Sequence, residues 1–364
     1  MKTCLWVGTY TCDVESGERR GTDGQGIYAF EFDDETQRAR LCSIYEGCRN
    51  PSFLAVSGNM LYAVSEMAEG GCVTALRYDA GQGRFTYVNE MPIPGSAACH
   101  VLIWKEKNCL VITNYLSGSM VNHALLPDGS IGARNGFFQY EGRGEDPVRQ
   151  EGPHAHSSIL SPDGKTLFVA DLGTDRLYHY RWDEASQGPV PCEACPETYV
   201  GPGEGPRHMC FSPDGRYLYL VTELKGNVFC YQYSSEDGHL TFVQKVPSLP
   251  ASYTGFNLAA DIHMSSDGRY LYVSERGADI ISVFQVDRET GLLGTCRFQL
   301  CGGKSPRNFC LSPCGRYIVA ANQDSGNLVI FRRNAQDGLL GEVVEEIRIP
   351  SPVCARMADR DSLL

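Results

Sequence analysis

The segment Ser212-Pro213-Asp214-Gly215-Arg216-Tyr217-Leu218-Tyr219-Leu220 joins a tight turn to a run of alternating apolar residues. The same pattern returns at residues 161–169, 265–273 and 312–319, the last with Cys314 in place of the aspartate. Degenerate copies of its apolar strand lie at residues 5–7, 61–64 and 109–112. Copies that recur about every fifty residues indicate a repeat architecture.

Each copy predicts four strands. Residues 206–246 show the order: a short apolar run, an Asp-Gly turn, an apolar strand, a Gly-containing turn, an alternating strand and a final strand. Asp-Gly between alternating apolar segments is a hairpin signal, and the two-residue form of that hairpin needs positive φ at both turn residues. Four antiparallel strands in each of seven copies describe a seven-bladed β-propeller. The sequence therefore predicts an all-β fold with residues 1–364 in a single domain.

The two ends of the chain are expected to share one blade. The first copy begins at its second strand, Leu5-Trp6-Val7, and lacks an inner strand. Near the other end, Pro352-Val353-Cys354-Ala355-Arg356-Met357 resembles the inner-strand segment Pro206-Arg207-His208-Met209. A C-terminal strand that completes the N-terminal blade would remove two exposed sheet edges and close the ring.

The composition excludes several kinds of partner. The chain has 32 Lys and Arg against 44 Asp and Glu, a formal charge of −12, so it is not expected to bind nucleic acid. We find no signal-peptide core at its start and no apolar run long enough to span a membrane. We therefore expect a cytoplasmic protein, monomeric or weakly self-associating, whose sixteen cysteines are reduced. The single CxxC, Cys192 to Cys195, lacks a second pair and is interpreted as an incidental loop.

Polar residues gather where one mouth of the channel is expected. Inner strands line a propeller channel, so the start of each inner strand and the end of the second strand lie at the same mouth. The starts carry His154, His156, Arg207, His208, Asp261, His263, Arg307 and Asn308. The ends carry Asn114, Tyr115, Asp171, Thr222, Glu223, Glu275, Arg276, Asn322, Gln323 and Asp324. Exposure of a strand end to solvent explains any single one of these residues as well as a functional role does. As a set rich in His, Arg and Asn, however, they predict a binding site at this mouth.

Three arginines at this mouth indicate an anionic ligand. Arg207 and Arg307 hold the same position relative to their turns, and Arg276 would project from the blade between them. Three guanidinium groups around one pocket repel one another unless an anion lies between them. Phosphate or carboxylate would fit, and each charge-assisted hydrogen bond contributes roughly 1.5 to 3 kcal/mol.

With these motifs in view, the chain resembles the propeller-type lactonase family of bacterial 6-phosphogluconolactonases and the related fungal carboxy-cis,cis-muconate lactonising enzymes. The resemblance runs essentially end to end, from Val7-Gly8-Thr9-Tyr10-Thr11 to Ala321-Asn322-Gln323-Asp324-Ser325. Its most specific stretches are Gln150-Glu151-Gly152-Pro153-His154-Ala155-His156-Ser157, Gly205-Pro206-Arg207-His208-Met209 and Ser274-Glu275-Arg276-Gly277. The residue before Cys99-His100 is Ala98 where the family more often has proline, a departure at a scaffold position.

The resemblance implies a seven-bladed fold and hydrolysis of 6-phospho-D-glucono-1,5-lactone to 6-phospho-D-gluconate in the oxidative pentose phosphate pathway. A His, a Glu and two Arg form the active-site group proposed for the lactonising relatives, and His154, Glu223, Arg207 and Arg276 match those motif positions.

We predict a metal-independent hydrolysis that needs no cofactor. Glu223 or His154 would deprotonate the attacking water, and the sequence leaves that choice open, while Arg276 or Asn322 would stabilise the oxyanion. The remaining predicted substrate- and phosphate-binding residues are Arg207, His208, His263, Arg307, His156, Asn114 and Gln323. A divalent ion held by Glu223, Asn322 and Asp171 stays as an alternative.

Two other functions stay open. Arginine pairs recognise carboxylates as readily as phosphates, so the substrate could instead be a muconate-type dicarboxylate or an unphosphorylated sugar lactone. A non-catalytic propeller that binds a protein partner has the same fold, although it would carry aromatic and arginine anchors across its flat top and not in the channel.

Overall fold

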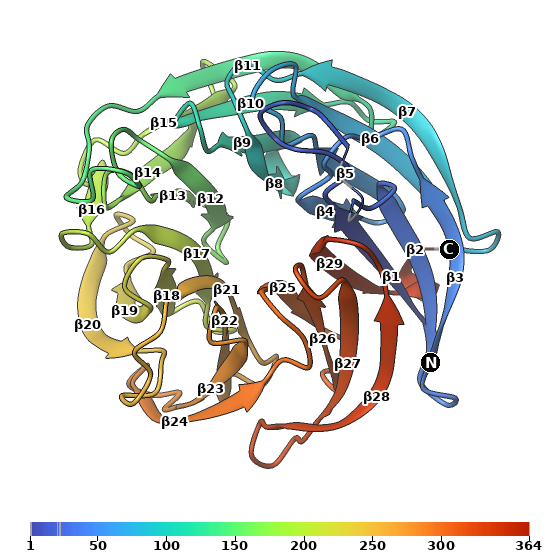
Figure 1. Cartoon of the computed structure of the whole chain (residues 1–364). Coiled ribbons are helices and arrows are strands. Elements are labelled where there is room, and N and C mark those ends of the chain that lie inside the picture. The colour runs from blue at the N-terminus through green and yellow to red at the C-terminus, as the bar shows by residue number, and fades with distance from the viewer. Residues whose placement is uncertain (1, 20, 22, 364) are drawn as a thin grey trace.

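Seven antiparallel sheets stand around a central channel in the computed structural model, which describes residues 2–19, 21 and 23–363 (Figure 1). Six sheets have four strands, and the fourth blade carries a further short strand, β16, because its outer edge is split between β15 and β16, which both pair with β14. This all-β ring confirms the predicted seven-bladed propeller.

The strands follow the chain around the ring, blade by blade. Blade 1 contains β1 (Lys2–Thr9), β2 (Ile27–Asp33), β3 (Arg38–Tyr45) and β29 (Pro352–Asp359). Blade 2 contains β4 (Leu54–Ser57), β5 (Met60–Val64), β6 (Cys72–Asp79) and β7 (Arg84–Pro92). Blade 3 contains β8 (Ala98–Trp104), β9 (Cys109–Asn114), β10 (Ser119–Leu125) and β11 (Ile131–Gln139). Blade 4 contains β12 (Ala155–Leu160), β13 (Thr166–Asp171), β14 (Arg176–Asp183), β15 (Gly188–Pro191) and β16 (Glu197–Tyr199).

The last three blades have the most regular sequences. Blade 5 contains β17 (Pro206–Phe211), β18 (Tyr217–Thr222), β19 (Asn227–Tyr233) and β20 (Leu240–Pro247). Blade 6 contains β21 (Leu258–Met264), β22 (Tyr270–Arg276), β23 (Ile280–Val286) and β24 (Leu293–Leu300). Blade 7 contains β25 (Pro306–Leu311), β26 (Tyr317–Asn322), β27 (Asn327–Arg333) and β28 (Leu340–Arg348). Two short 3₁₀ helices, η1 (Lys105–Lys107) and η2 (Arg360–Leu363), complete the elements, and neither is long and apolar enough to cross a membrane.

The repeated Ser-Pro-Asp-Gly segment forms the turn between the first and second strands, as predicted, but the turn type was wrong. In blade 5 the Gly215 N–H donates to the Ser212 carbonyl at 2.9 Å, and the Ser212 N–H donates to the Tyr217 carbonyl at 2.8 Å. Only the glycine has positive φ, at 74°, because the Asp214 side chain supports a longer loop by accepting from the Ser212 hydroxyl at 2.7 Å.

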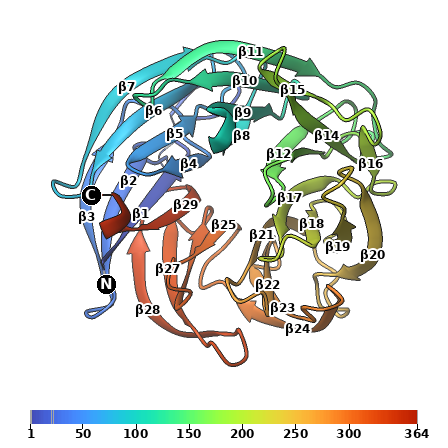
Figure 2. The ribbon, with the colours of Figure 1, turned by 180° about the vertical axis from the view of Figure 1, so that it is seen from behind.

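The C-terminal strand completes the first blade, which confirms the predicted closure. Strand β29 pairs antiparallel with β1, with Leu5 opposite Met357 and Val7 opposite Ala355, and the two termini lie on the same blade (Figures 1 and 2). Strand β1 is buried from Thr3 to Thr9 and β29 from Pro352 to Ala355, so the joint between them belongs to the core. Apolar side chains on both faces of the middle strands pack between neighbouring blades, as in the cluster that joins blades 5 and 6.

Candidate active site

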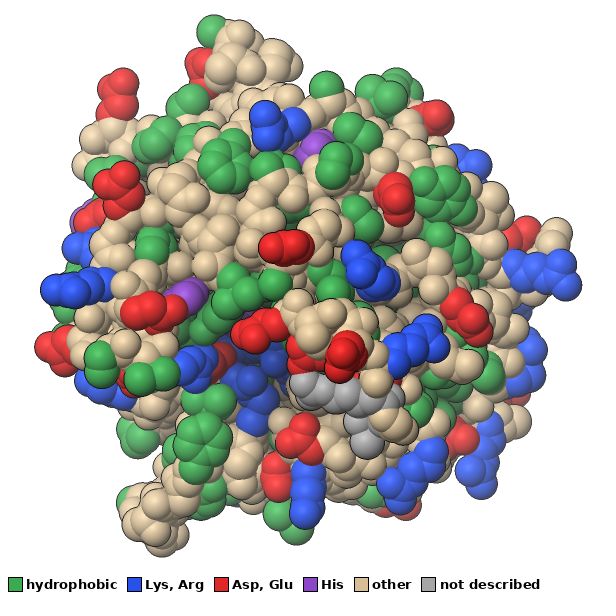
Figure 3. Space-filling model, turned by 45° about the horizontal axis from the view of Figure 1, so that its top comes forward, with side chains coloured by type: hydrophobic (Ala, Val, Ile, Leu, Met, Phe, Trp, Pro, Cys, Tyr) green, Lys and Arg blue, Asp and Glu red, His purple; other side chains and the backbone are tan. Residues whose placement is uncertain are grey.

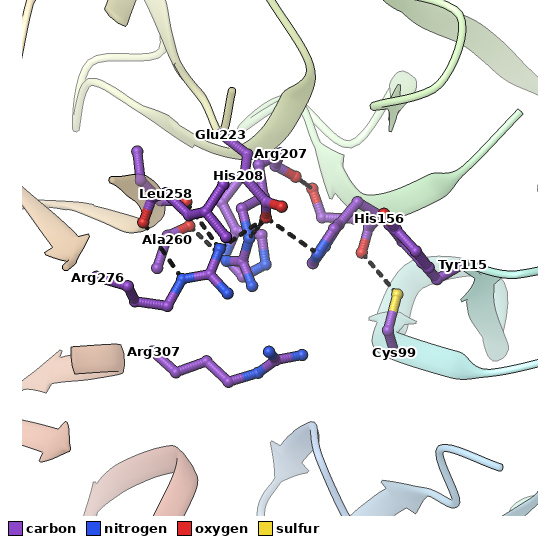
Figure 4. A network of polar contacts seen from close by, with 12 residues as sticks. Cys99, Tyr115, His156, Arg207, His208, Glu223, Leu258, Ala260, Arg276 and Arg307 are labelled. Atoms are coloured by element: carbon purple, nitrogen blue, oxygen red, sulfur yellow. Dashed lines mark hydrogen bonds and ion pairs between the residues drawn. The ribbon is translucent and has the colours of Figure 1, made fainter. Parts of the chain in front are cut away.

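A β-bulge at the mouth end of four inner strands directs one side chain of each strand toward the channel. In β8, β12, β17 and β25 the pairing with the second strand skips one residue, and the skipped residues are Cys99, His156, Arg207 and Arg307. A bulge re-aims the side chain of its extra residue, which explains why chemically active side chains gather at this position. Figure 4 shows these four side chains around one shared space.

Glu223 is the centre of a cluster that it forms with Arg149, Arg207 and Arg276. It follows β18 and is buried, and its carboxylate Oε2 accepts from Arg207 Nε and Arg276 Nη2 at 2.7 Å each (Figure 4). Its Oε1 accepts from Arg149 Nη2. Burial alone would raise the pKa of Glu223, but the positive charges of Arg276 and Arg207 outweigh it and hold the pKa well below its usual range. The carboxylate is therefore ionised at neutral pH.

Arg307 differs from Arg149, Arg207 and Arg276, whose guanidinium groups all donate hydrogen bonds. Its side chain extends into the channel at 18% exposure, 3.8 Å from Glu66 Oε1 and 5.3 Å over the ring of Tyr10. Among the residues described, it has no hydrogen-bond partner, although a guanidinium has five N–H donors. Figure 3 shows Lys and Arg side chains in a hollow of the surface with Asp and Glu side chains around it.

The site has an excess of positive charge. Among the residues that the structure describes, Arg149, Arg207, Arg276 and Arg307 form ion pairs with two carboxylates, Glu223 and Glu66. The nearby His156 is neutral, because burial and the charge of Arg207 lower its pKa well below the ordinary value. The geometry thus favours an anionic ligand, as the sequence predicted.

His154 and His156 lie on neighbouring parts of the wall. His154 Nδ1 is 2.9 Å from the Tyr115 carbonyl oxygen, and its Nε2 is 3.2 Å from Glu151 Oε1. A carbonyl oxygen only accepts, so Nδ1 carries a proton. The Glu151 carboxylate beside Nε2 also only accepts, so Nε2 offers a lone pair only when the ring carries a single proton. His156 Nε2, and not His154, approaches Glu223, at 4.0 Å.

Two predicted phosphate ligands, His208 and His263, are held elsewhere. His208 Nδ1 lies 2.7 Å from Asp261 Oδ1, and His263 Nε2 lies 2.9 Å from Asp261 Oδ2. Both line a separate cavity of about 330 Å³, deeper in the channel, together with His100 and Arg356. The structure therefore places these imidazoles against a carboxylate instead of among the four arginines.

Asn114 and Asn322 also turn away from the mouth. Each is the last residue of a second strand, and each amide donates to the segment that connects the preceding blade to its own, Asn114 Nδ2 to the Pro94 carbonyl at 3.1 Å and Asn322 Nδ2 to the Cys301 carbonyl at 3.2 Å. Successive side chains of a strand point to opposite faces, so the residue after each one, such as Tyr115 or Gln323, is the one that reaches the mouth. Gln323 lines a neighbouring cavity with Tyr10 and Asp324.

The alternative prediction was a divalent ion held by Glu223, Asn322 and Asp171. Asp171 Oδ1 accepts from the backbone N–H groups of His154 and Gly173 at 2.8 Å each, and the Asn322 amide donates to the Cys301 carbonyl. Three guanidinium groups surround Glu223, and their charge would repel a cation. The three residues therefore do not form a matching set of metal ligands.

Sequence reasoning missed Arg149, Tyr10 and Glu66, and it placed Tyr115 at the mouth without giving it a role. Arg149 comes from the loop before β12, where no strand periodicity marks it, and its backbone N–H is held by Asp146 Oδ1 at 2.9 Å. The one available signal was its position, directly before the Gln150-Glu151-Gly152 segment.

Glu275, next to Arg276 on β22, is a buried carboxyl group. It points into blade 6 and is fully buried; its Oε2 accepts from Asn257 Nδ2 at 2.5 Å, and its Oε1 has no hydrogen-bond partner among the described residues. Burial raises the pKa of Glu275 to about 7. The folded protein therefore holds a proton that the unfolded chain releases above pH 4.5, so stability falls as pH rises from 4.5 to 7.

We expect Glu275→Gln to remove this loss and to raise the free energy of unfolding at pH 8 by about 3 kcal/mol. Denaturant unfolding of both proteins at pH 5 and pH 8 measures it. Equal gains at both pH values would contradict the assignment.

Comparisons with known proteins agree with the seven-bladed fold. The family model described as lactonase, 7-bladed beta-propeller, matches residues 4–357. The chain is 32% identical to the 6-phosphogluconolactonase of Bacillus subtilis (strain 168) over 353 residues, 96% of this chain and 97% of that protein. It is 32% identical to the 6-phosphogluconolactonase of Formosa agariphila over 349 residues, covering 94% and 96%. The solved structure of a periplasmic gluconolactonase from Pseudomonas aeruginosa superimposes with a TM-score of 0.90, at 29% identity, covering 99% of both chains.

Proposed function

The chain belongs to the family of seven-bladed β-propeller lactonases and is a lactone-hydrolysing enzyme, and we propose that its substrate is 6-phospho-D-glucono-1,5-lactone, which it hydrolyses to 6-phospho-D-gluconate in the oxidative pentose phosphate pathway. The observation that carries the proposal is the excess of guanidinium groups at the mouth, with Arg307 open to an anion. A phosphate group supplies the charge and the acceptor oxygens that these donors lack.

His154 acts as the general base in this proposal. Its Nε2 lone pair accepts a proton from the attacking water, while the Tyr115 carbonyl fixes the ring and Glu151 stabilises the imidazolium that forms. Glu223 is the weaker candidate, because three arginines hold its pKa low and a weak base removes a proton poorly.

Besides the base, the reaction needs positive charge that stabilises the negative oxygen of the intermediate. Water adds to the lactone carbonyl, and the positive charge of Arg276 and its neighbours stabilises the tetrahedral oxyanion. The intermediate expels the ring oxygen, which takes the proton back from His154, and the new carboxyl group releases its own proton to solvent. Arg307 holds the phosphate at the opposite side of the mouth.

The proposal is tested with purified protein on freshly prepared 6-phosphogluconolactone, with the spontaneous rate subtracted and a parallel reaction containing a chelator. We expect turnover that the chelator does not change. Activity only on a dicarboxylate or an unphosphorylated lactone would replace the proposed substrate, and inactivity on every lactone would contradict the enzymatic assignment.

Arg307→Ala should separate phosphate binding from chemistry. We expect kcat/KM for the phosphorylated lactone to fall about 10²-fold, since two charge-assisted hydrogen bonds are lost, while glucono-1,5-lactone loses less than about threefold. Steady-state kinetics on both lactones measure this, with Arg143→Ala, an exposed arginine on the loop before β12, as the control. Equal losses on both substrates would place Arg307 in the chemical step.

A further inference from the structure

Tyr115 is the polar side chain at the mouth that the reaction has not yet used. It follows β9, is partly exposed, and its ring stacks on the His154 imidazole with centroids 4.5 Å apart and planes at 15°. The same ring meets His156 edge-on at 5.5 Å. Tyr115 therefore lies directly against the proposed base and beside the other histidine of the wall.

The hydroxyl group of Tyr115 has one partner, and that partner is a donor. Arg149 Nη2 lies 3.2 Å from the Tyr115 oxygen, and the same nitrogen also donates to Glu223 Oε1. The guanidinium has no lone pair, so it donates and the phenol oxygen accepts. The Tyr115 O–H proton has no acceptor among the residues that the structure describes, which leaves it available to a ligand.

The surroundings make this O–H a good donor. Burial and the negative charge of Glu223 raise the pKa of Tyr115, so the phenol keeps its proton at neutral pH. A charged donor on the phenol oxygen polarises the O–H bond and strengthens the hydrogen bond that it donates. Arg149 thus connects the Glu223 carboxylate to the Tyr115 hydroxyl through two hydrogen bonds.

We infer that Tyr115 is a further catalytic residue, whose hydroxyl donates a hydrogen bond to the oxyanion formed from the lactone carbonyl, with Arg149 as its positioning residue. No proton is transferred by Tyr115: the bond forms as the carbonyl oxygen becomes negative and is released when the carbonyl re-forms. The inference rests on the proposed site of lactone opening but not on the phosphate group, because every lactone passes through the same oxyanion.

Tyr115→Phe isolates the hydroxyl, since the phenyl ring keeps the stack on His154. We expect kcat to fall about 10²-fold with KM unchanged, the usual effect of removing one oxyanion donor. The loss should be equal on 6-phosphogluconolactone, glucono-1,5-lactone and the neutral aryl lactone dihydrocoumarin. Tyr178→Phe is the matched control, because Tyr178 also stacks on an aromatic ring, that of Tyr140 at 4.2 Å, in blade 4, and should keep full activity.

The role of Arg149 is tested by a double-mutant cycle. Arg149→Met should reduce kcat about tenfold in the wild-type background but at most about twofold in the Tyr115→Phe background, because both changes remove the same interaction. Additive losses would show that Arg149 acts independently of Tyr115.

Four outcomes decide the inference. A Tyr115→Phe variant with wild-type kcat overturns it, and so does a loss confined to the phosphorylated lactone, which would make Tyr115 a phosphate ligand. A wild-type protein that opens the unphosphorylated lactones but not 6-phosphogluconolactone contradicts the proposed substrate. The oxyanion role of Tyr115 is then tested by the kcat of Tyr115→Phe on the two unphosphorylated lactones. A protein that opens none of the three overturns both.

Discussion

Glu223→Gln is expected to reduce kcat for lactone hydrolysis roughly 10³-fold, the upper end of the range for loss of one oxyanion donor, because Glu223 holds several such donors in place. Glutamine keeps the shape of the side chain but removes the negative charge that holds Arg149, Arg207 and Arg276 together. The loss should appear on phosphorylated and unphosphorylated lactones alike, because the arginine cluster then spreads and the donors around the reacting carbonyl lose their positions. Steady-state kinetics with both lactones measure it.

The same substitution should also destabilise the protein. Removing one partner of a buried ion pair leaves uncompensated charge, which costs about 3 to 5 kcal/mol. Because the folded pKa of Glu223 lies below the usual value of 4.5, its contribution is present above that pH and is lost as pH falls through the folded pKa. The stability deficit of the variant should therefore be full at pH 7 and shrink below pH 4.5.

Glu275→Gln is the matched control for this experiment. It makes the identical change at a buried carboxylate in the neighbouring blade, where burial raises the pKa instead of lowering it, so its effect on stability at pH 8 has the opposite sign. If Glu223→Gln left both kcat and the free energy of unfolding unchanged at pH 7, Glu223 could not be the centre of the cluster.

The ring and the position of the site follow from periodic features of the sequence. Seven copies of an apolar strand after a turn fix the strand order, and the pairing of Pro206 with Thr222 and of Pro306 with Asn322 places the starts and ends of those strands at one mouth. These are properties of every blade, so one chain contains several copies of the same signal.

The direction of each side chain at the mouth could not be predicted in the same way. A strand alternates with a period of two, but a bulge shifts that alternation by one residue, and nothing in the sequence marks the bulge in advance. For this reason Arg207 and Arg307 reach the mouth as predicted, whereas His208, one residue later, faces the deeper cavity and the Asn322 amide donates to the segment that precedes its blade. Arg149 was missed because loops carry no period, and its contact with Glu223 spans 74 positions of sequence.

Deletion of residues 352–364 should abolish folding of the isolated chain. The deleted part contains β29, in which Val353, Cys354 and Ala355 are buried, and it exposes the whole edge of β1. The strand also joins its neighbours across the ring: the Ala355 N–H donates to Asn308 Oδ1 at 2.7 Å in blade 7, and Arg356 Nε donates to the Leu54 carbonyl at 3.1 Å in blade 2. We expect aggregated protein without a cooperative unfolding transition, since the loss is comparable to the net stability of a whole domain, about 5 to 15 kcal/mol.

A synthetic peptide covering residues 350–360 distinguishes the loss of one strand from a general defect. Added during refolding, it should pair with the free edge of β1 and restore both the cooperative transition and lactonase activity, because an extended peptide can add a strand to an exposed sheet edge. A shorter deletion, residues 360–364, is the control: it removes η2 but leaves β29, and should stay folded with a reduced midpoint. A chain ending at residue 351 that folds and hydrolyses lactones without the peptide would mean that blade 1 does not need its inner strand, and that the ring is held closed by contacts between the other blades.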